Sequence, residues 1–240
     1  MHSRTVVKVA IVSLALAASA AGVFAQQAAP ANPATAPRGV PPLMFKEVWK
    51  VPQAAIDNEA THFTRRVVPE SVTNPQLELR RYGQHAYGLE IITHRAGGQD
   101  LWNGFSIWTG YTPAPVAFLL RDKSNFADLT GLARMRAAVR TNALHMLHPA
   151  VKLADGTLLA GNRGITTEGT GFVQAEVVFD SMRWYRLDPV TVTVLALVPN
   201  PDLSKVDEVG FADLMPAGGP DGGGWTNTST IELYARPVPR

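Results

Sequence analysis

The chain has 240 residues, with 22 basic side chains, 20 acidic ones and no cysteine. The lack of cysteine excludes disulfide bridges and thiolate metal sites, so the fold has to depend on its hydrophobic core. The near balance of charge excludes the net basic surface that nucleic-acid binding requires, and it offers no polybasic membrane signal.

The N-terminus has the pattern of a secretory signal peptide. Arg4 and Lys8 precede an apolar run from Val9 to Phe24, and small residues stand before the expected cleavage after Ala25. The run has roughly 16 residues against the ~20 that span a bilayer, which disfavours the alternative of a membrane anchor. The rest of the sequence has no pattern of a transmembrane helix. We therefore expect a secreted or periplasmic protein whose remaining 20 basic and 20 acidic residues balance.

Composition divides the chain into three segments. Residues 1–25 form the predicted signal peptide, and residues 26–42 are rich in Ala, Pro and Gln, which predicts a disordered or extended tether. Residues 43–240 are enough for one well-buried domain.

The pattern after residue 42 predicts an all-β fold. We count about ten short runs of alternating or β-branched residues, spaced by roughly 10–15 residues, and no run that predicts a long helix. This pattern is typical of an antiparallel β-sandwich or jelly roll. Within it, Val190–Val198 is a run of β-branched and aliphatic residues that predicts a core strand covered on both faces.

Residues 132–153 predict a β-hairpin. Before Thr141–Asn142, small or apolar residues alternate with arginines, which is the period-two signature of a half-buried strand. Asn tolerates the positive φ of a two-residue turn, so the chain would return as a second strand alongside the first.

This hairpin would present a polar face with four side chains: Arg134, Arg136, Arg140 and His145. Arg121 would lie on a neighbouring strand. Clustered cations repel one another unless an anion lies among them, so one interpretation is a site for an acidic ligand. The other is a solvated sheet face whose partners are internal acids such as Glu176.

Aromatic residues, several beside Gly-rich loops, form a second candidate site: Trp102, Trp108, Tyr111, Trp184, Tyr185 and Trp225. The C–H face of a sugar ring stacks on an aromatic ring, while its hydroxyls bind Arg, Asn or Asp. The alternative is core packing, which is what we expect of Trp184. Trp102 and Trp225, flanked by Asn and Gly, are better candidates for a ligand site.

Four later segments resemble the galactose-binding-like jelly roll of carbohydrate-binding modules. They are Asn125–Arg140, Trp184–Asp188, Val206–Phe211 and Ile231–Tyr234. In that family a D-L-(S/T)-G entry leads into a core strand, a tryptophan-led strand follows, and a V-D-x-V-G-F-like strand precedes the closing strand. The resemblance covers roughly residues 116–234, and the chain departs from it by extra N-terminal strands.

The motifs of this resemblance are specific to the fold more than to the ligand, and the resemblance allows structural calcium. Hard oxygen ligands could come from four acids: Asp122, Asp207, Glu208 and Asp213. No calcium-loop pattern is present. His145 and His148 would point to opposite faces of a strand, which disfavours a transition-metal site, so no cofactor is expected.

These observations predict an exported carbohydrate-binding protein that uses loop aromatics and the Arg/His sheet face. No G-x-S-x-G, HExxH, P-loop or Rossmann pattern occurs. One alternative is a structural or protein-binding domain of the envelope. The other is a secreted hydrolase or lyase that acts on a glycan at the same face. In that case His145 would act as a base, Arg136 would neutralise a carboxylate, and Glu176 would supply a second titratable group.

Overall fold

The structure, a computed structural model, describes residues 39–51, 64–93, 104–167, 171–217 and 223–240. These residues form β-strands and three short 3-10 helices and contain no α-helix, so the predicted all-β fold is confirmed. None of their helices is long and apolar enough to cross a membrane. The predicted signal peptide and all but the last residues of the predicted tether lie outside the described part of the chain.

One sheet has seven strands: β1 (Leu43–Val48), β2 (Thr64–Arg66), β4 (Glu90–Thr93), β5 (Phe105–Trp108), β8 (Arg134–Asn142), β11 (Val173–Val178) and β15 (Trp225–Tyr234). Its order is β11–β8–β15–β5–β4–β2, and β1 pairs with the second half of β15 beside this path. All of these pairings are antiparallel.

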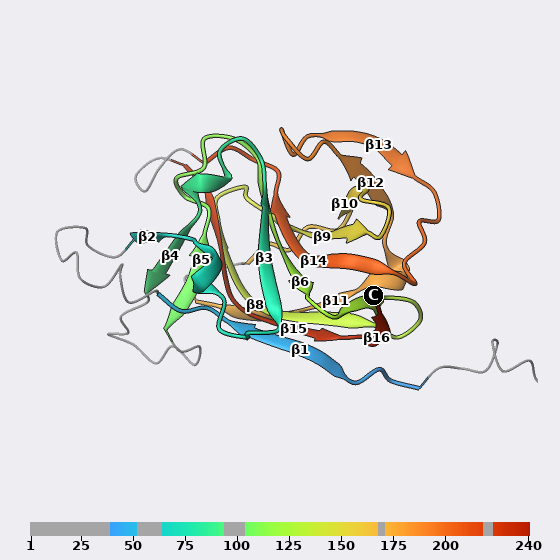
Figure 1. Cartoon of the computed structure of the whole chain (residues 1–240). Helices are drawn as coiled ribbons and strands as arrows, with labels where there is room; N and C mark the ends of the chain where they lie inside the picture. The colour runs from blue at the N-terminus through green and yellow to red at the C-terminus, as the bar shows by residue number, and fades with distance from the viewer. Residues whose placement is uncertain (1–38, 52–63, 94–103, 168–170, 218–222) are drawn as a thin grey trace, which may run out of the picture. The chain divides into compact units, whose positions relative to one another are not determined.

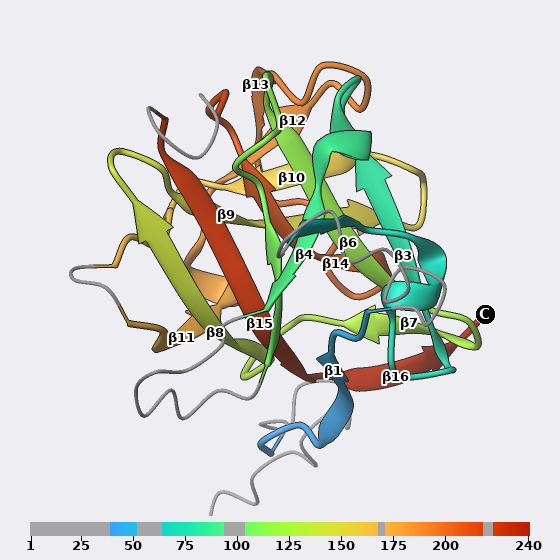
Figure 2. The same ribbon diagram turned by 90° about the vertical axis from the view of Figure 1, so that its left-hand side faces the viewer.

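The other sheet has nine strands: β3 (Leu77–Tyr82), β6 (Val116–Asp122), β7 (Asn125–Asp128), β9 (Leu147–Leu153), β10 (Leu158–Gly161), β12 (Trp184–Leu187), β13 (Val194–Val198), β14 (Val206–Asp213) and β16 (Arg236–Pro239). Its order is β13–β12–β10–β9–β14–β6–β3, with β7 between β14 and β16. The 3-10 helices are η1 (Pro69–Ser71), η2 (Ala86–Gly88) and η3 (Phe179–Ser181). Figures 1 and 2 show the two sheets layered against each other, which confirms the predicted sandwich.

The main core lies between the sheets and follows from the alternation along each strand. In β8, Met135, Ala137 and Val139 are buried, whereas Arg134 and Arg136 on the other face remain partly exposed. The buried side chains pack into one cluster with inward side chains of β6 and β14. Burying a large apolar side chain in this way contributes roughly 1.5–3 kcal/mol.

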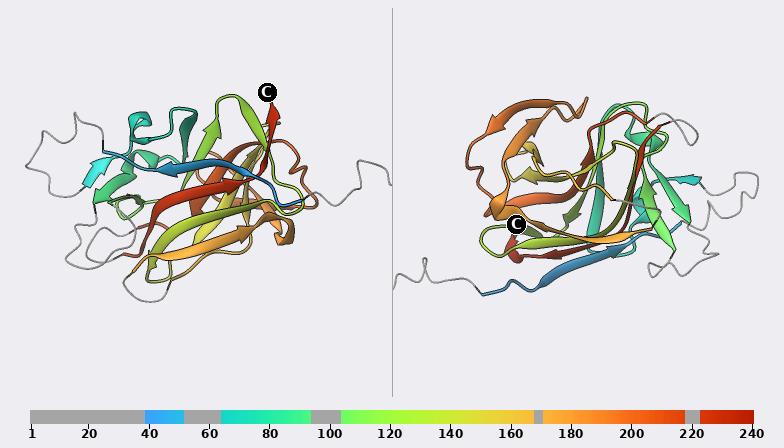
Figure 3. Two further views of the ribbon diagram at one scale, coloured as in Figure 1. Left: turned by 90° about the horizontal axis from the view of Figure 1, so that it is seen from below. Right: turned by 180° about the vertical axis from the view of Figure 1, so that it is seen from behind.

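The nine-stranded sheet also buries part of its other face. A second apolar cluster lies there, with Ala117, Leu119 and Ala150 on central strands and Val192 in the β12–β13 loop. In the same loop the Pro189 carbonyl accepts a hydrogen bond from the N–H of Gly83, at the end of β3, over 3.2 Å. Because β13 and β3 end the sheet on opposite sides, this contact requires the sheet to be strongly curled, as Figures 1 and 3 show.

The predicted hairpin over residues 132–153 is wrong. β8 pairs with β11 and β15, whereas β9 pairs with β10 and β14 of the other sheet. The turn after Asn142, in which Ala143 has a φ of 55°, carries the chain from one sheet to the other. Alternation determines which face of a strand is buried but not which strand lies beside it, and here distant strands take both places.

The prediction of a fully covered strand over Val190–Val198 is also wrong. β13 begins only at Val194 and is an edge strand of its sheet. Leu195 and Leu197 are more than half exposed, and only Val192 in the preceding turn is fully buried. A continuous aliphatic run has the same composition at the edge and in the centre of a sheet, so composition alone does not distinguish the two.

Close packing of β14 on β6 gives a test of this topology. A Cβ at Gly210 would lie 2.2 Å from the carbonyl oxygen of Phe118 and 2.7 Å from the Cα of Leu119, both backbone atoms of β6. Gly210→Ala should therefore lower the free energy of unfolding by roughly 3 kcal/mol or more in urea titrations. Gly171→Ala, which meets no atom within 4 Å, is the matched control and should be nearly neutral. Equal effects of the two substitutions would contradict this packing.

Candidate functional site

Arginine and aromatic side chains gather on the outer face of the seven-stranded sheet. We call this surface, formed by Arg134, Arg136, Arg140, Trp225 and Tyr234, the Arg–aromatic face. The arginines come from β8 and the two aromatic residues from opposite ends of β15, its register neighbour. Figure 3 (left) shows β1, β15, β8 and β11 side by side in this sheet.

The rings of the Arg–aromatic face hold its guanidinium groups in place. The Cζ atoms of Arg134 and Arg136 lie 4.8 and 5.5 Å from the ring centroid of Tyr234. Arg140 lies over the indole of Trp225 at 4.8 Å. A guanidinium held against a ring keeps N–H donors at its edges, so these contacts orient the donors without using them up.

Acidic side chains only partly match the arginines of this face. Arg136 Nε donates to Glu176 Oε2 over 2.7 Å, and Arg134 Nε lies 3.5 Å from the same oxygen. The hydrogen bond and charge of Glu176 raise the pKa of Arg136 further. On the next strand Glu232 forms an ion pair with Lys46 over 2.9 Å. Two guanidinium groups thus share one carboxylate, which leaves donors available to a ligand.

Trp108 and Tyr111 lie beside the Arg–aromatic face. Trp108 pairs with Asn227 of β15 and is 7% exposed, so it packs as a wall and presents little surface. Tyr111 is 39% exposed and meets the indole edge-on, with ring centroids 5.0 Å apart. The turn fits closely over Trp108, because a Cβ at Gly110 would lie only 1.9 Å from the indole.

His145 does not belong to the Arg–aromatic face, contrary to the sequence-based prediction. It is 2% exposed, and its Nδ1 lies 2.8 Å from Oδ2 of Asp213 in the nine-stranded sheet. The hydroxyl of Thr109 donates to the same oxygen over 2.8 Å and accepts from the N–H of Thr226 in β15. Asp213, His145 and Thr109 therefore form a buried polar link between the two sheets.

Arg121 lies on the other sheet and belongs to a charged ladder across four strands. In register, Glu78, Arg121, Glu208 and Lys152 alternate in sign from β3 to β9. Arg121 Nε donates to Asp207 over 3.0 Å. Arg121, Glu208 and Lys152, together with Asp207 and Tyr82, line a hollow of about 500 Å³.

Tyr82 is held inside this hollow by Glu208. Its hydroxyl donates to Glu208 Oε2 over 2.6 Å, and Lys152 Nζ contacts both groups at 3.1 and 3.3 Å. Burial, followed by the hydrogen bond to Glu208, raises the pKa of the phenol well above its ordinary value. The charged groups are matched within the ladder.

The remaining predicted site residues are Trp102 and the four proposed calcium ligands. Trp102 lies outside the described residues. Each proposed calcium ligand has protein partners of its own: Asp122 caps the turn before β7, and Asp207 pairs with Arg121 and Arg240. In the part of the chain that the structure describes, no three His, Asp or Glu side chains gather as a metal site. Calcium binding stays a prediction.

Sequence reasoning missed Tyr234 and Tyr82. Both stand at the ends of alternating strands, at positions where the alternation directs every second side chain away from the main core. Tyr234 could have been found by aligning the outward positions of β15 with those of β8, had their pairing been known.

No protein-family model and no curated protein sequence matches the chain. Among solved structures, it is similar to an exo-β-agarase with a TM-score of 0.39 and 8% identity, over 75% of this chain and 25% of that one. It is also similar to CtCBM11 in solution, with a TM-score of 0.37 and 13% identity over 74% and 98% of the two chains. A third match is the family 11 carbohydrate-binding module of a cellulosomal cellulase from Clostridium thermocellum, with a TM-score of 0.38 and 13% identity over 72% and 95%. The chain spans about a quarter of the agarase. Similarity at this level does not identify a ligand. A ligand for this protein therefore has to be inferred from its own side chains.

The buried link between the sheets should be essential for stability. Asp213→Ala leaves His145 and Thr109 without their acceptor inside the protein, so the free energy of unfolding should fall by roughly 3–5 kcal/mol. Asp180→Ala is the matched control, because Asp180 is exposed and has no hydrogen-bond partner in the described part of the chain. Urea titrations in which the two variants behave alike would contradict the role of the link.

The ion pair of Glu232 predicts a pH dependence. The hydrogen bond from Lys46 is the largest cause that lowers the pKa of Glu232, and the hydroxyl of Tyr234 adds to it. A lowered folded-state pKa stabilises the fold above the unfolded value, about 4.3, and this contribution is lost as pH falls through the folded value. Lys46→Met should cost at most about 1 kcal/mol near neutral pH, because the pair is partly exposed. Below the folded pKa the variant and the parent protein should have equal stability in urea titrations, and a constant deficit would assign the effect to packing.

Proposed function

We propose that the protein is an exported carbohydrate-binding protein whose Arg–aromatic face binds a glycan. The observation that carries this proposal is the set of three arginines held over Trp225 and Tyr234 on an outer sheet face. Export rests on the signal-peptide pattern of residues 1–25.

The chemistry of this face suits a sugar chain. The partly buried rings of Trp225 and Tyr234 supply apolar edges for the C–H groups of a pyranose. The guanidinium edges supply planar sets of N–H donors for hydroxyl or carboxylate oxygens. Because the rings already fix the arginines, binding loses less side-chain entropy than it would with free arginines.

The charges of the face favour a glycan that carries acidic groups. Arg134 and Arg136 both lie against the carboxylate of Glu176, whereas Glu232, opposite Arg136 on β15, forms its ion pair with Lys46. A uronate or sulfate group could accept two parallel N–H bonds from one guanidinium, as carboxylates and phosphates do elsewhere. Neutral glycans would use the same donors through hydroxyls with weaker bonds.

The geometry gives less support to the alternative of a secreted hydrolase or lyase. That mechanism needs His145 as a base beside Arg136. His145 is buried against Asp213, whereas Arg136 is on an outer sheet face with 41% of its side chain exposed. Glu176 remains near Arg136, but its contacts are those of an ion pair on a sheet surface.

The proposal predicts that the arginines, rather than charge in general, retain the glycan. Purified protein would be tested by affinity electrophoresis against alginate, polygalacturonate, xylan and cellulose, with released reducing or unsaturated ends measured in parallel. Arg134→Ala together with Arg136→Ala should weaken retention by acidic glycans by about tenfold or more, as expected for lost charge-assisted hydrogen bonds. Trp225→Ala should weaken it as well, because Arg140 then loses its support.

The matched control for these substitutions is Arg163→Ala, since Arg163 is exposed and, among the described residues, forms a hydrogen bond only with the hydroxyl of Ser181. Unchanged retention in the double arginine variant, with its stability intact, would refute the Arg–aromatic face as the binding site. Release of new chain ends by the parent protein would identify an enzyme instead of a binding protein.

A further inference from the structure

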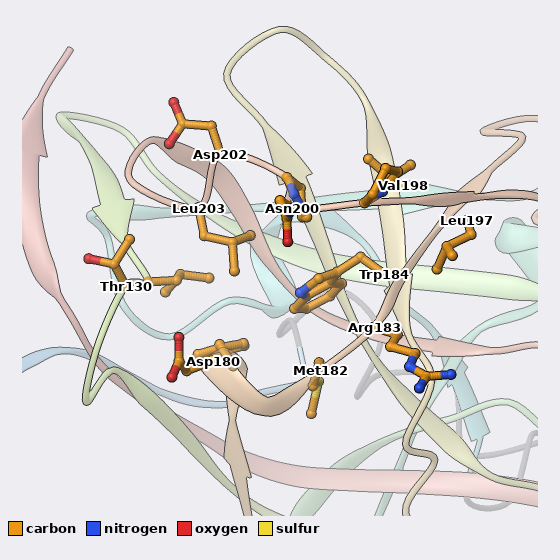
Figure 4. Close-up of a pocket in the computed structure, with 14 residues that line it drawn as sticks. Thr130, Asp180, Met182, Arg183, Trp184, Leu197, Val198, Asn200, Asp202 and Leu203 are labelled. Carbon is orange, nitrogen blue, oxygen red and sulfur yellow. The ribbon is translucent and has the colours of Figure 1, made fainter.

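A hollow of about 440 Å³ lies at the side of the sandwich, away from the Arg–aromatic face. One wall comes from η3, which follows the edge strand β11, and from Thr130 before β8. The other comes from β12, the end of the edge strand β13 and residues 199–203 (Figure 4). Its volume is within the range of pockets that hold small organic ligands.

Trp184 forms the floor of this hollow and has an unused hydrogen-bond donor. Its side chain is 2% exposed and stacks on Phe179, with ring centroids 6.4 Å apart and an interplanar angle of 18°. Among the described residues the indole Nε1 has no acceptor. Figure 4 shows the indole nitrogen directed into the space between η3 and residues 200–203. This N–H therefore faces the open space of the hollow, where a ligand oxygen or a water molecule can accept its hydrogen bond.

The rim of the hollow supplies acceptors of its own. Asp180 and Asn200 have no hydrogen-bond or ion-pair partner in the described part of the chain. Asp202 uses only Oδ1, which accepts from the N–H and the hydroxyl of Ser204. The hydroxyl hydrogen bond from Ser204 is the largest cause that lowers the pKa of Asp202, so this carboxylate is ionised at neutral pH. In Figure 4 Asn200 is directed toward the indole of Trp184, whereas the guanidinium of Arg183 extends away from it.

Apolar side chains complete the lining between the floor and the rim. Met182, Leu197 and Leu203 surround Trp184, and Leu197 is 52% exposed at the opening. A ligand in this hollow therefore meets a donor at its inner end, an apolar belt around its body, and carboxylate and amide groups at its outer end.

We propose that this hollow is a second carbohydrate site, which binds one neutral sugar ring at a chain end or as a free monosaccharide. A ring hydroxyl would accept from Trp184 Nε1, and hydroxyls at the opposite end would donate to Asp180 and Asp202. The C–H groups of the ring would lie against Met182 and Leu203. The ligand class rests on the proposed function, but the site is separate from the Arg–aromatic face and has the opposite charge preference.

Charge and polarity together select this ligand class. Asp180 and Asp202 disfavour an anionic sugar, and the guanidinium of Arg183 extends away from the indole of Trp184. A purely apolar ligand would displace water from the indole N–H and the rim carboxylates without replacing its hydrogen bonds, which is costly. A sugar hydroxyl both donates and accepts, so one ring can satisfy the donor at the floor and the acceptors at the rim.

The test follows the indole N–H signals of the full protein by nuclear magnetic resonance. The chain has five tryptophans, and Trp184→Phe and Trp225→Phe assign the signals of the two sites. Glucose, galactose, mannose and xylose would be titrated to millimolar concentrations, with galacturonate and lysine amide as an anionic and a cationic probe. A neutral sugar should shift the Trp184 signal in a saturable way, and galacturonate should leave it unchanged.

Substitutions at the rim test the same site without disturbing the core. Asp180→Ala combined with Asn200→Ala should weaken the saturable shift of the Trp184 signal by the neutral sugar by about tenfold or more. Asp155→Ala, on an exposed turn, is the matched control. If no neutral sugar shifts the Trp184 signal, or if lysine amide alone does, the second site is refuted.

The two proposals can fail independently. The Arg134/Arg136 variant could lose its retention by acidic glycans while no sugar shifts the Trp184 signal. This result would support the Arg–aromatic face as a binding site and refute the hollow as one. A saturable shift of the Trp184 signal, in a protein that binds no acidic glycan, would support the hollow as a sugar site. It would refute the Arg–aromatic face as a glycan site.

Discussion

The antiparallel pairing of β8 with β15 is the constraint on which the rest of this structure depends. It runs from Asn142 and Trp225 at one end to Arg134 and Tyr234 at the other. Side chains alternate across it with a period of two, so one face gives Met135 and Leu233 to the core. The opposite face brings the arginines of β8 over the rings of β15. The same register thus determines both the stability of the sandwich and the chemistry of its outer surface.

A second constraint joins the two sheets at one end. Asp213 from the nine-stranded sheet accepts from His145 and from Thr109, which is tied to the backbone of Thr226. Gly224 packs so closely on the imidazole that a Cβ there would lie 2.0 Å from it. The link therefore fixes the chain immediately before Trp225, and with it one end of the Arg–aromatic face.

The sequence was sufficient for the fold class and for the alternation of β8, because both depend on local periodicity. It was insufficient for the partner of β8, since β9 and β15 both contribute apolar side chains to the same core, and β9 follows β8 after only a short turn. His145 was placed on the wrong surface as a direct result of that pairing error. The exposure of β13 could not be predicted either, because an aliphatic edge strand and an aliphatic central strand have the same composition.

The candidate sites were likewise predicted only in part. Arg134, Arg136 and Trp225 were predicted as ligand-binding residues, and the structure brings them to one face; whether they bind a ligand stays a prediction. Trp108 was predicted with them but is a buried wall, which flanking glycines did not reveal. Tyr234, which contacts both Arg134 and Arg136, carried no local signal beyond its place in an alternating strand. Contacts between side chains more than ninety residues apart depend on topology, and topology was the part that periodicity left open.

The edge strand β13 has a consequence for how the protein behaves in concentrated solution. From Pro189 to Pro199 the chain has no charged residue, and Val194, Leu195 and Leu197 expose about half of their surface. Natural edge strands commonly carry a lysine or another charge that prevents a second chain from adding to the sheet. Without one, the outer backbone groups of β13 offer a template for edge-to-edge pairing between molecules. A single lysine at Leu195 would be the simplest way to keep concentrated preparations monomeric.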